Sequence, residues 1–280
     1  MKKLLYLVVI GLFLQIGCQS KTEPAKKEMA VAAKQVQKET PKKVKNSLAE
    51  QLQKPEVPIL CYHRIRNILA SDGANMKAYS VTPTDFAQQM KALSDNGFHS
   101  ILPNQLYDYL VYNAKLPSKP VMITFDDTRE EQYSLAVPEM NKYGFKGVYF
   151  IMTISINRPK YMTKEQIKNL SDNGHSIGAH SWDHHMVTKY VGKDWENQLS
   201  KPKKKLEDII GKPVNYFAYP DGVWNHASIA EIKKSGYQLA FSLSTKRDET
   251  EPLFTVRRII VAGNVSANGM LKSMQSSFNK

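Results

Sequence analysis

From residue 57 onward, two patterns of hydrophobic and polar positions alternate along the chain. In the first, Phe86, Met90 and Leu93 follow one another at i, i+4 and i+7, which places all three on one face of a helix. Thr82-Pro83 is a typical helix start before them, and Gly97 is a typical end. The same pattern predicts helices over three further stretches, 164–172, 195–210 and 228–235.

The second pattern is a short, almost uninterrupted apolar run, which is typical of a strand buried on both faces. Such runs predict strands over 58–62, 121–125, 147–152, 176–179, 214–219, 237–243 and 255–261. Strands that alternate with helices indicate a parallel sheet with helical crossovers, either open and doubly wound or closed into a barrel. Seven or eight strands favour the barrel.

The N-terminal residues have the pattern of an export signal. Lys2 and Lys3 precede an apolar run over 4–16, and Gly17 stands directly before Cys18. A helix over that run would be about 20 Å long, short of the roughly 30 Å hydrocarbon core of a membrane. We therefore expect a signal peptide over 1–18. Residues 14–18 resemble a bacterial lipoprotein box, which implies lipidation of Cys18; ordinary cleavage beside an unmodified cysteine is the alternative.

The next segment, 19–56, consists mainly of Lys, Gln, Ala and Glu and is predicted to be a flexible tether to a catalytic domain over 57–280. The formal net charge of the chain is +13, but about half of the excess lies in this segment and in the signal peptide. That distribution argues against a nucleic-acid partner, which requires basic residues gathered on a folded face. Two cysteines, Cys18 and Cys61, exclude a disulfide framework.

The residues that follow the predicted strands lie where the working residues of such folds are found. They are His63, Asp126, Asp127, His180, His184, His185, Pro220 and Asp221. Two His and one carboxylate, with positions left open to water, indicate a catalytic metal site. His180 and His184 share a face if their segment is a helical turn, whereas His185 replaces His184 if it is a loop. A structural alternative is that the carboxylates cap the next helix and the histidines lie on the surface.

Three segments carry a resemblance to a known family. Thr124-Phe125-Asp126-Asp127 and His180-Ser181-Trp182-Asp183-His184 resemble the first two motifs of the polysaccharide deacetylases, also called carbohydrate esterase family 4 or the NodB-homology domain. Phe217-Ala218-Tyr219-Pro220-Asp221-Gly222 is similar to the third motif. The resemblance covers roughly residues 58–261. It implies an α/β fold, a distorted and incomplete (β/α) barrel of about seven parallel strands, and metal-dependent removal of acetyl groups from sugars.

The resemblance also implies roles for individual residues. Asp127, His180 and His184 would hold the metal, and Asp126 would be the general base. Many members carry the general acid, a His, near the C-terminal end, but no His follows His226 in this chain. Leu60-Cys61-Tyr62-His63 instead resembles the poly-β-1,6-N-acetylglucosamine deacetylase subgroup, which implies that His63 is the acid.

The third motif departs from the family pattern. Ala218 stands where many members have an Arg that pairs with the base, and we expect Arg257 or Arg258 to supply that charge. Tyr219, Pro220 and Asp221 are expected at the substrate, with a backbone N–H near Tyr219 or Asp221 facing the oxyanion. Asp221 occupies a position where an aromatic residue is common.

The resemblance implies a hydrolase of carbon–nitrogen bonds other than peptide bonds. Its expected substrate is an N-acetylglucosamine polysaccharide, with the β-1,6 polymer favoured because of His63. The alternatives are peptidoglycan, chitin oligomers or O-acetyl xylan as substrates, or an inactive glycan-binding barrel. The expected cofactor is a divalent ion, zinc before cobalt or nickel. We expect a monomer that is exported to the cell surface or a periplasm-facing membrane and anchored through Cys18.

Overall fold

A computed structural model of the chain describes residues 44–278. The predicted signal peptide over 1–18, the lipidation site Cys18 and tether residues 19–43 lie outside these described residues. Among the residues described, no helix has the length and apolar character needed to cross a membrane.

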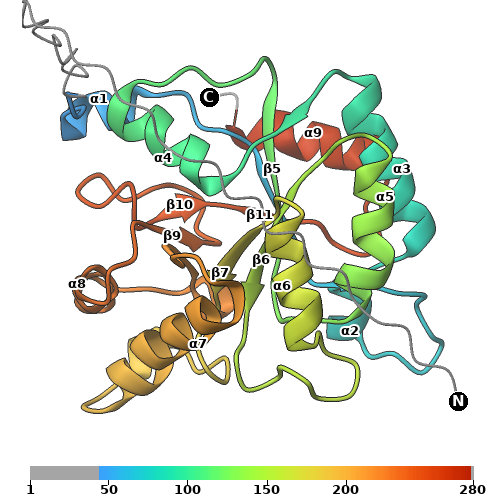
Figure 1. The fold of residues 1–280 in the computed structure, drawn as a ribbon. Helices are drawn as coiled ribbons and strands as arrows, with labels where there is room; N and C mark the ends of the chain where they lie inside the picture. Colours follow the sequence, from blue (N-terminus) through green and yellow to red (C-terminus); the bar gives the residue numbers. More distant parts are fainter. Residues whose placement is uncertain (1–43, 279–280) are drawn as a thin grey trace, which may run out of the picture. The chain divides into compact units, whose positions relative to one another are not determined.

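Parallel strands form the main sheet and alternate with helices along the chain, as predicted (Figure 1). In spatial order they are β10 (Val256–Arg257), β9 (Leu239–Ser242), β8 (Tyr216–Ala218), β7 (Ser176–Ala179), β6 (Gly147–Ile151), β5 (Pro120–Phe125), β1 (Ile59–Tyr62) and β11 (Ile259–Ile260). A short β4 (His99–Ser100) also pairs with β5, while β2 (Arg64–Ile65) and β3 (Ser80–Val81) form a separate parallel pair.

The two edges of this sheet are joined by neighbouring residues of the chain. β10 pairs with β9 at one edge and β11 pairs with β1 at the other, with only Arg258 between them. The Arg258 N–H donates to Ser242 O (3.0 Å), and the Val261 N–H donates to Cys61 O (3.0 Å). This segment closes the sheet into a distorted barrel, which confirms the predicted fold. The strand expected over 255–261 is two short strands because each half pairs with a different partner.

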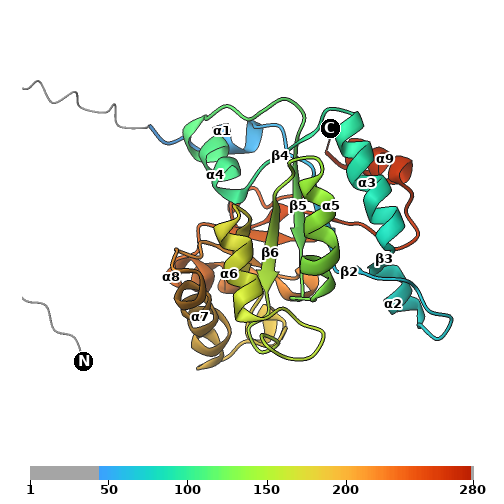
Figure 2. The same ribbon diagram turned by 45° about the vertical axis from the view of Figure 1, so that its right-hand side comes forward.

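Helices surround the sheet, as Figures 1 and 2 show. They are α1 (Leu48–Gln53), α2 (Ala74–Ala78), α3 (Pro83–Asp95), α4 (Pro103–Tyr112), α5 (Val137–Asn141), α6 (Lys164–Asp172), α7 (Lys201–Ile210), α8 (His226–Lys234) and α9 (Ala267–Phe278). Two π-helical turns, Gln132–Ala136 and Glu196–Ser200, lead into α5 and α7, and 3-10 turns cover Val187–Lys189 and Pro220–Gly222. The helix predicted over 195–210 therefore exists, but its first turn is wider than an α-helix.

Successive residues of a strand belong in turn to two different hydrophobic clusters. Ile59 and Met122 pack inside the barrel with Phe150 and residues of α4, while Leu60 and Ile123 pack outward against the surrounding helices. Because side chains alternate along a strand, a polar residue at an inward position is enclosed by the barrel. His63, Asp126 and His180 continue this inward alternation just beyond the ends of β1, β5 and β7.

The described residues before β1 lie against the barrel rather than apart from it. Composition predicts a tether as far as residue 56, yet the Asn46 side-chain amide donates to Leu110 O (2.7 Å) and Arg247 donates to the carbonyls of Gln51 and Leu52. Helix α1 begins with a capping box in which Ser47 and Glu50 satisfy each other's backbone N–H groups. Contacts to the barrel therefore begin upstream of residue 57.

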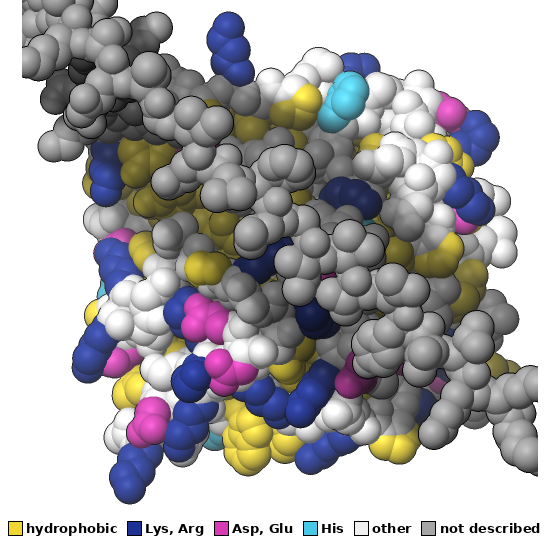
Figure 3. Space-filling view, viewed as in Figure 1, with side chains coloured by type: hydrophobic (Ala, Val, Ile, Leu, Met, Phe, Trp, Pro, Cys, Tyr) yellow, Lys and Arg dark blue, Asp and Glu magenta, His cyan; other side chains and the backbone are white. Residues whose placement is uncertain are grey.

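Basic side chains on the outer helices are interspersed with acidic ones, as the lower left of Figure 3 shows. On α7, Lys204 pairs with Asp208 (3.0 Å) and Lys203 with Glu207 (2.9 Å), each at i,i+4 spacing. Pairs of this kind are neighbours on a helix surface, so the positive charge of α7 is partly balanced locally.

A buried histidine outside the site gives a pH-dependent prediction. His175 accepts a hydrogen bond at Nδ1 from the Gly147 N–H (3.0 Å), and burial together with nearby Lys146 lowers its pKa from 6.5 to about 4. The folded state thus excludes a proton that the unfolded state binds, so the stabilising effect is complete above about pH 6.5 and is lost towards pH 4. Replacing His175 with Asn, whose side-chain oxygen can still accept that bond, should reduce the acid sensitivity of unfolding.

The expected difference is about 2 kcal/mol in the free energy of unfolding between roughly pH 7.5 and pH 5. Urea denaturation of both proteins at the two pH values measures it. Equal losses of stability in the wild type and in His175→Asn would contradict the prediction.

Candidate metal centre and active site

The predicted site residues meet at the carboxyl end of the sheet. Asp126 and Asp127 follow β5, His180 follows β7 and His63 follows β1. These side chains line one cavity of about 290 Å³ together with His184, Tyr219 and Asp221. The parallel topology brings them together because all the strand ends lie on the same side of the sheet.

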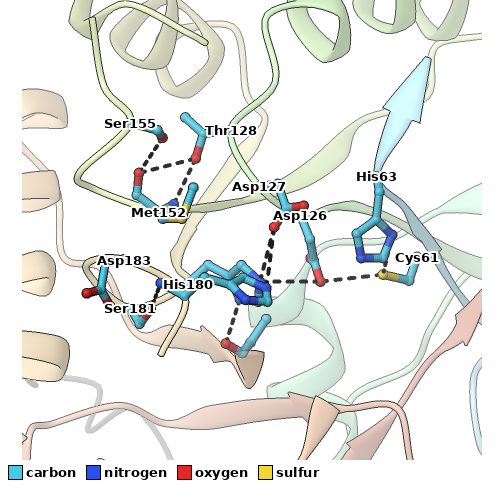
Figure 4. A network of polar contacts seen from close by, with 12 residues as sticks. Cys61, His63, Asp126, Asp127, Thr128, Met152, Ser155, His180, Ser181 and Asp183 are labelled. Atoms are coloured by element: carbon cyan, nitrogen blue, oxygen red, sulfur yellow. Dashed lines mark hydrogen bonds and ion pairs between the residues drawn. The ribbon is translucent and has the colours of Figure 1, made fainter. Parts of the chain in front are cut away.

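Asp127, His180 and His184 form a possible metal-binding triad. The Oδ1 atom of Asp127 lies 3.6 Å from Nε2 of His180 and 3.6 Å from Nε2 of His184. His180 Nδ1 is 2.8 Å from Ala218 O, so it donates its hydrogen there and leaves the Nε2 lone pair facing Asp127 (Figure 4). Burial lowers the pKa of His180, which favours the neutral imidazole that a metal requires.

The triad has the unsatisfied atoms expected of a cation site. Among the described residues, Asp127 Oδ1 and His180 Nε2 are buried without a hydrogen-bond partner. Leaving such atoms unpaired costs about 1–3 kcal/mol each, and more for a charged group. One ion between them would satisfy both, so the residues present fit a divalent metal.

The segment that carries the histidines is a bend rather than a helical turn. Ser181 (φ 63°) and His184 (φ 71°) are both left-handed, and Ser181 Oγ accepts the His184 N–H (2.9 Å). This turn brings His184 to Asp127, whereas the His185 ring lies 5.7 Å from that of Tyr190. Of the two alternatives left open by the sequence, the segment is a loop rather than a helical turn, yet His184 and not His185 lies beside Asp127 and His180. Left-handed residues other than Gly are uncommon and gather at functional sites.

Asp126 is held by a buried arginine. Nη1 and Nη2 of Arg258 lie 2.7 and 2.8 Å from the two carboxylate oxygens, and Nη1 also donates to Thr124 Oγ1 (3.1 Å). Burial alone would raise the pKa of Asp126, but the Arg258 charge and then His180 overcome it and hold that pKa well below its usual range. Asp126 is consequently an ionised carboxylate inside the barrel.

Arg257, the other expected partner of the base, points elsewhere. Its Nη2 lies 2.7 Å from Glu56 Oε2, and it also donates to Ser277 O (2.7 Å). Neighbouring residues of an extended segment face opposite ways, so only one of the two arginines can reach Asp126. The structure brings Arg258 there, in place of the Arg that is missing at Ala218.

His63 lies on the other side of Asp126 from His180, as Figure 4 shows. Its ring packs against Tyr79, with centroids 4.9 Å apart, and its Nδ1 lies 4.0 Å from Cys61 Sγ. Gln132 donates to both His63 O and Asp126 O, which ties the two strand ends together. The sequence pattern did not single out Tyr79 or Gln132, because neither follows a strand of the main sheet or lies in a recognised motif.

Tyr219 is engaged in the fold rather than free for substrate. Its N–H donates to Phe241 O (3.0 Å), its hydroxyl donates to Phe254 O (2.9 Å), and its ring is buried. Of the two positions expected to supply an oxyanion donor, the N–H of Tyr219 is therefore already paired within the sheet. Pro220 has no N–H, and Asp221 adopts a left-handed conformation (φ 57°) at the cavity wall. The Asp221 N–H is the donor that remains from this motif.

Comparisons with known proteins agree with this geometry. The family model described as polysaccharide deacetylase matches residues 113–240. The poly-β-1,6-N-acetyl-D-glucosamine N-deacetylase of Staphylococcus aureus (strain MRSA252) is 30% identical over 211 residues, which are 67% of this chain and 72% of that protein. The chain belongs to the polysaccharide deacetylase family. This polysaccharide deacetylase is thus a hydrolase of carbon–nitrogen bonds, in a metal-dependent family.

Solved structures show the same fold. The Streptococcus pyogenes deacetylase PplD in complex with acetate is 25% identical, with a TM-score of 0.73 over 79% of this chain and 99% of that one. IcaB from Ammonifex degensii is 26% identical, with a TM-score of 0.67 over 80% of this chain and 98% of that one. The match therefore covers almost the full length of each of the two solved chains.

The triad predicts which histidines retain a metal. A His180→Ala, His184→Ala double variant should lose the one tightly bound divalent ion per chain, because two of three ligands are removed. His185→Ala is the matched control and should retain the ion. Elemental analysis after dialysis against metal-free buffer measures both. One ion per chain in a double variant that also carries Cys61→Ser, or loss of the ion from the control, would contradict the assignment.

Proposed function

We propose that this polysaccharide deacetylase removes N-acetyl groups from an N-acetylglucosamine polymer, with poly-β-1,6-N-acetylglucosamine as the favoured substrate and zinc as the ion. One observation carries the proposal: His63, from the first strand, shares a cavity with Asp126 and with the Asp127, His180 and His184 triad. A base, an acid and metal ligands thus face the same space. The staphylococcal relative, named for the β-1,6 polymer, supports the choice of substrate.

Asp126 has the properties of the general base. It is ionised, it lines the cavity and its two oxygens are oriented by Arg258 at 2.7 and 2.8 Å. When bound to the triad, a divalent ion polarises the amide carbonyl and makes water easier to deprotonate. Asp126 accepts the proton of the attacking water as the new carbon–oxygen bond forms.

His63 and Asp221 act on the two sides of the tetrahedral intermediate. The Asp221 N–H donates to the oxyanion, where a preorganised donor stabilises developing charge. His63 gives a proton to the departing nitrogen as the carbon–nitrogen bond breaks, because an unprotonated amine is a poor leaving group. The products are acetate and a free glucosamine residue of the polymer.

Acetate release tests this proposal. The metal-free full chain is supplied with zinc, cobalt or nickel and offered β-1,6 or β-1,4 N-acetylglucosamine oligomers, with Asp126→Asn and His63→Gln as blanks. We expect release that requires the metal, is fastest with the β-1,6 oligomer and falls about 10²–10⁴-fold in either blank. Faster release from the β-1,4 oligomer would move the substrate to chitin-like polymers or peptidoglycan. Oligomer binding without release from any substrate would indicate an inactive glycan-binding barrel.

We also propose export and lipid anchoring of the protein through Cys18. The proposal is supported by the apolar run over 4–16 and by the resemblance of residues 14–18 to a lipoprotein box. Mass spectrometry of the mature N-terminal peptide tests it. An unmodified Cys18, or a mature chain that begins elsewhere, would contradict it.

A further inference from the structure

We propose that Cys61, His63 and Asp126 form a second cation site beside the metal triad, and that zinc or another thiophilic divalent ion bound there inhibits the enzyme. The inhibition, though not the binding, rests on the proposed function, because His63 and Asp126 are the proposed acid and base. An ion that bonds to both side chains would remove both from proton transfer. The triad binds the activating ion, and this acid–base site binds the inhibitory one.

The separations between the ligand atoms suit a tetrahedral ion. Cys61 Sγ lies 3.5 Å from Asp126 Oδ2 and 4.0 Å from His63 Nδ1, and all three atoms are within 4.8 Å of one another. An ion with bonds of about 2.0–2.3 Å separates its tetrahedral ligands by roughly 3.3–3.8 Å. In the triad, Asp127 Oδ1 lies 3.6 Å from Nε2 of each histidine. Both separations from Cys61 Sγ are therefore within a few tenths of an ångström of tetrahedral geometry.

The two sites differ in the chemistry of their ligands. The triad offers one carboxylate oxygen and two imidazoles, whereas the acid–base site adds a sulfur from Cys61. Thiolate selects zinc and softer ions over magnesium or calcium. The thiolate and the Asp126 carboxylate each carry −1 and Arg258 carries +1, so these three contacting groups sum to one negative charge, which favours a cation.

Access to the acid–base site comes from the catalytic cavity. Cys61 is fully buried on β1, but His63 and Asp126 both line that cavity. Figure 4 shows the three side chains next to one another. An ion arriving through the cavity contacts these two side chains first and the sulfur last. The fourth position faces the cavity and takes water from it.

The order in which the two sites fill follows from the protons. A cysteine binds a metal as the thiolate, so a proton must leave Cys61 to solvent as the sulfur–metal bond forms. The ligand atoms of the triad already lie 3.6 Å apart and no thiol proton has to leave, so the triad binds its ion at lower concentration. Activity should thus rise as the first ion binds and fall as the second one does.

Cadmium binding tests the acid–base site without reference to activity. The full chain carries two cysteines, so Cys18→Ser leaves Cys61 as its single thiol. This variant should bind two cadmium ions, the second with the ultraviolet charge-transfer band of a cadmium–thiolate bond. Cys18→Ser, Cys61→Ser should bind one ion without the band. In Cys18→Ser, His180→Ala, His184→Ala the band should persist, because its ligands are intact.

Zinc inhibition of acetate release is the second test of the acid–base site. Each variant is compared with its own activity at one equivalent of zinc, which removes any effect of the substitution on basal turnover. Zinc at ten times the dissociation constant of the acid–base site should lower the activity of Cys18→Ser about tenfold. The variant that also carries Cys61→Ser should lose less than about twofold over the same range.

The outcomes separate the two proposals. A cadmium–thiolate band in a protein that releases no acetate with any metal would contradict the proposed function and leave the acid–base site standing. Absence of the band in Cys18→Ser, or equal zinc inhibition with and without Cys61, would overturn the acid–base site while leaving the proposed function untouched.

Discussion

Replacing Asp126 with Asn should lower turnover about 10²–10⁴-fold, the contribution typical of a general base, while the tightly bound metal remains. The amide has the shape of the carboxylate but cannot take a proton from water, and the triad does not include this residue. Acetate release under saturating substrate, paired with elemental analysis of the same sample, measures both quantities.

An exposed aspartate provides the control for this substitution. Asp208 on α7 pairs with Lys204 at the surface, and Asp208→Asn removes the same charge with the same change of shape. We expect turnover within about twofold of wild type, because such surface pairs contribute little. Turnover of Asp126→Asn close to that of Asp208→Asn would rule out Asp126 as the base.

Replacing Arg258 with Met should destabilise the fold by about 3–5 kcal/mol and slow turnover, because it leaves Asp126 buried without its cation. Without the guanidinium, burial becomes the dominant influence and raises the pKa of Asp126. The carboxylate then becomes protonated at a higher pH, so the acidic limb of the turnover profile should move upward. Denaturant unfolding and a pH–turnover profile measure the two effects.

Arg257→Met is the matched control, because the neighbouring arginine is also buried in an ion pair, but with Glu56. It should lower stability and leave the pH profile of turnover in place. Adding Asp126→Asn to Arg258→Met should recover stability relative to Arg258→Met alone, since the unpaired buried charge is gone. An unchanged acidic limb in Arg258→Met, or a shifted one in Arg257→Met, would show that Arg258 does not set the protonation of the base.

Local pattern was sufficient for most of the architecture. Helix α6 has the bounds that its apolar spacing predicts, and the strands β5, β6 and β7 agree with their apolar runs to within one residue at each end. These elements are readable because helix and strand periodicity depend on residues a few positions apart. The convergence of Asp126, Asp127 and His180 was also predictable, because parallel strands bring their carboxyl ends to one edge.

The choice between alternatives depended on contacts between distant parts of the chain. Whether Arg257 or Arg258 reaches Asp126 depends on where the last strand breaks between its two pairing partners, β9 and β1. That His184 rather than His185 meets Asp127 depends on left-handed backbone at Ser181 and His184, which spacing does not reveal.

The sequence by itself therefore determined the alternating fold, the family and the set of residues at the strand ends. The tertiary structure decided the arginine partner of the base, the engagement of Tyr219 with Phe241 and Phe254, and the approach of Cys61 to Asp126. The physical reason is range. Periodicity and strand ends are local properties. Each of these contacts instead joins residues between 22 and 132 positions apart, and whether they meet depends on which strands pair.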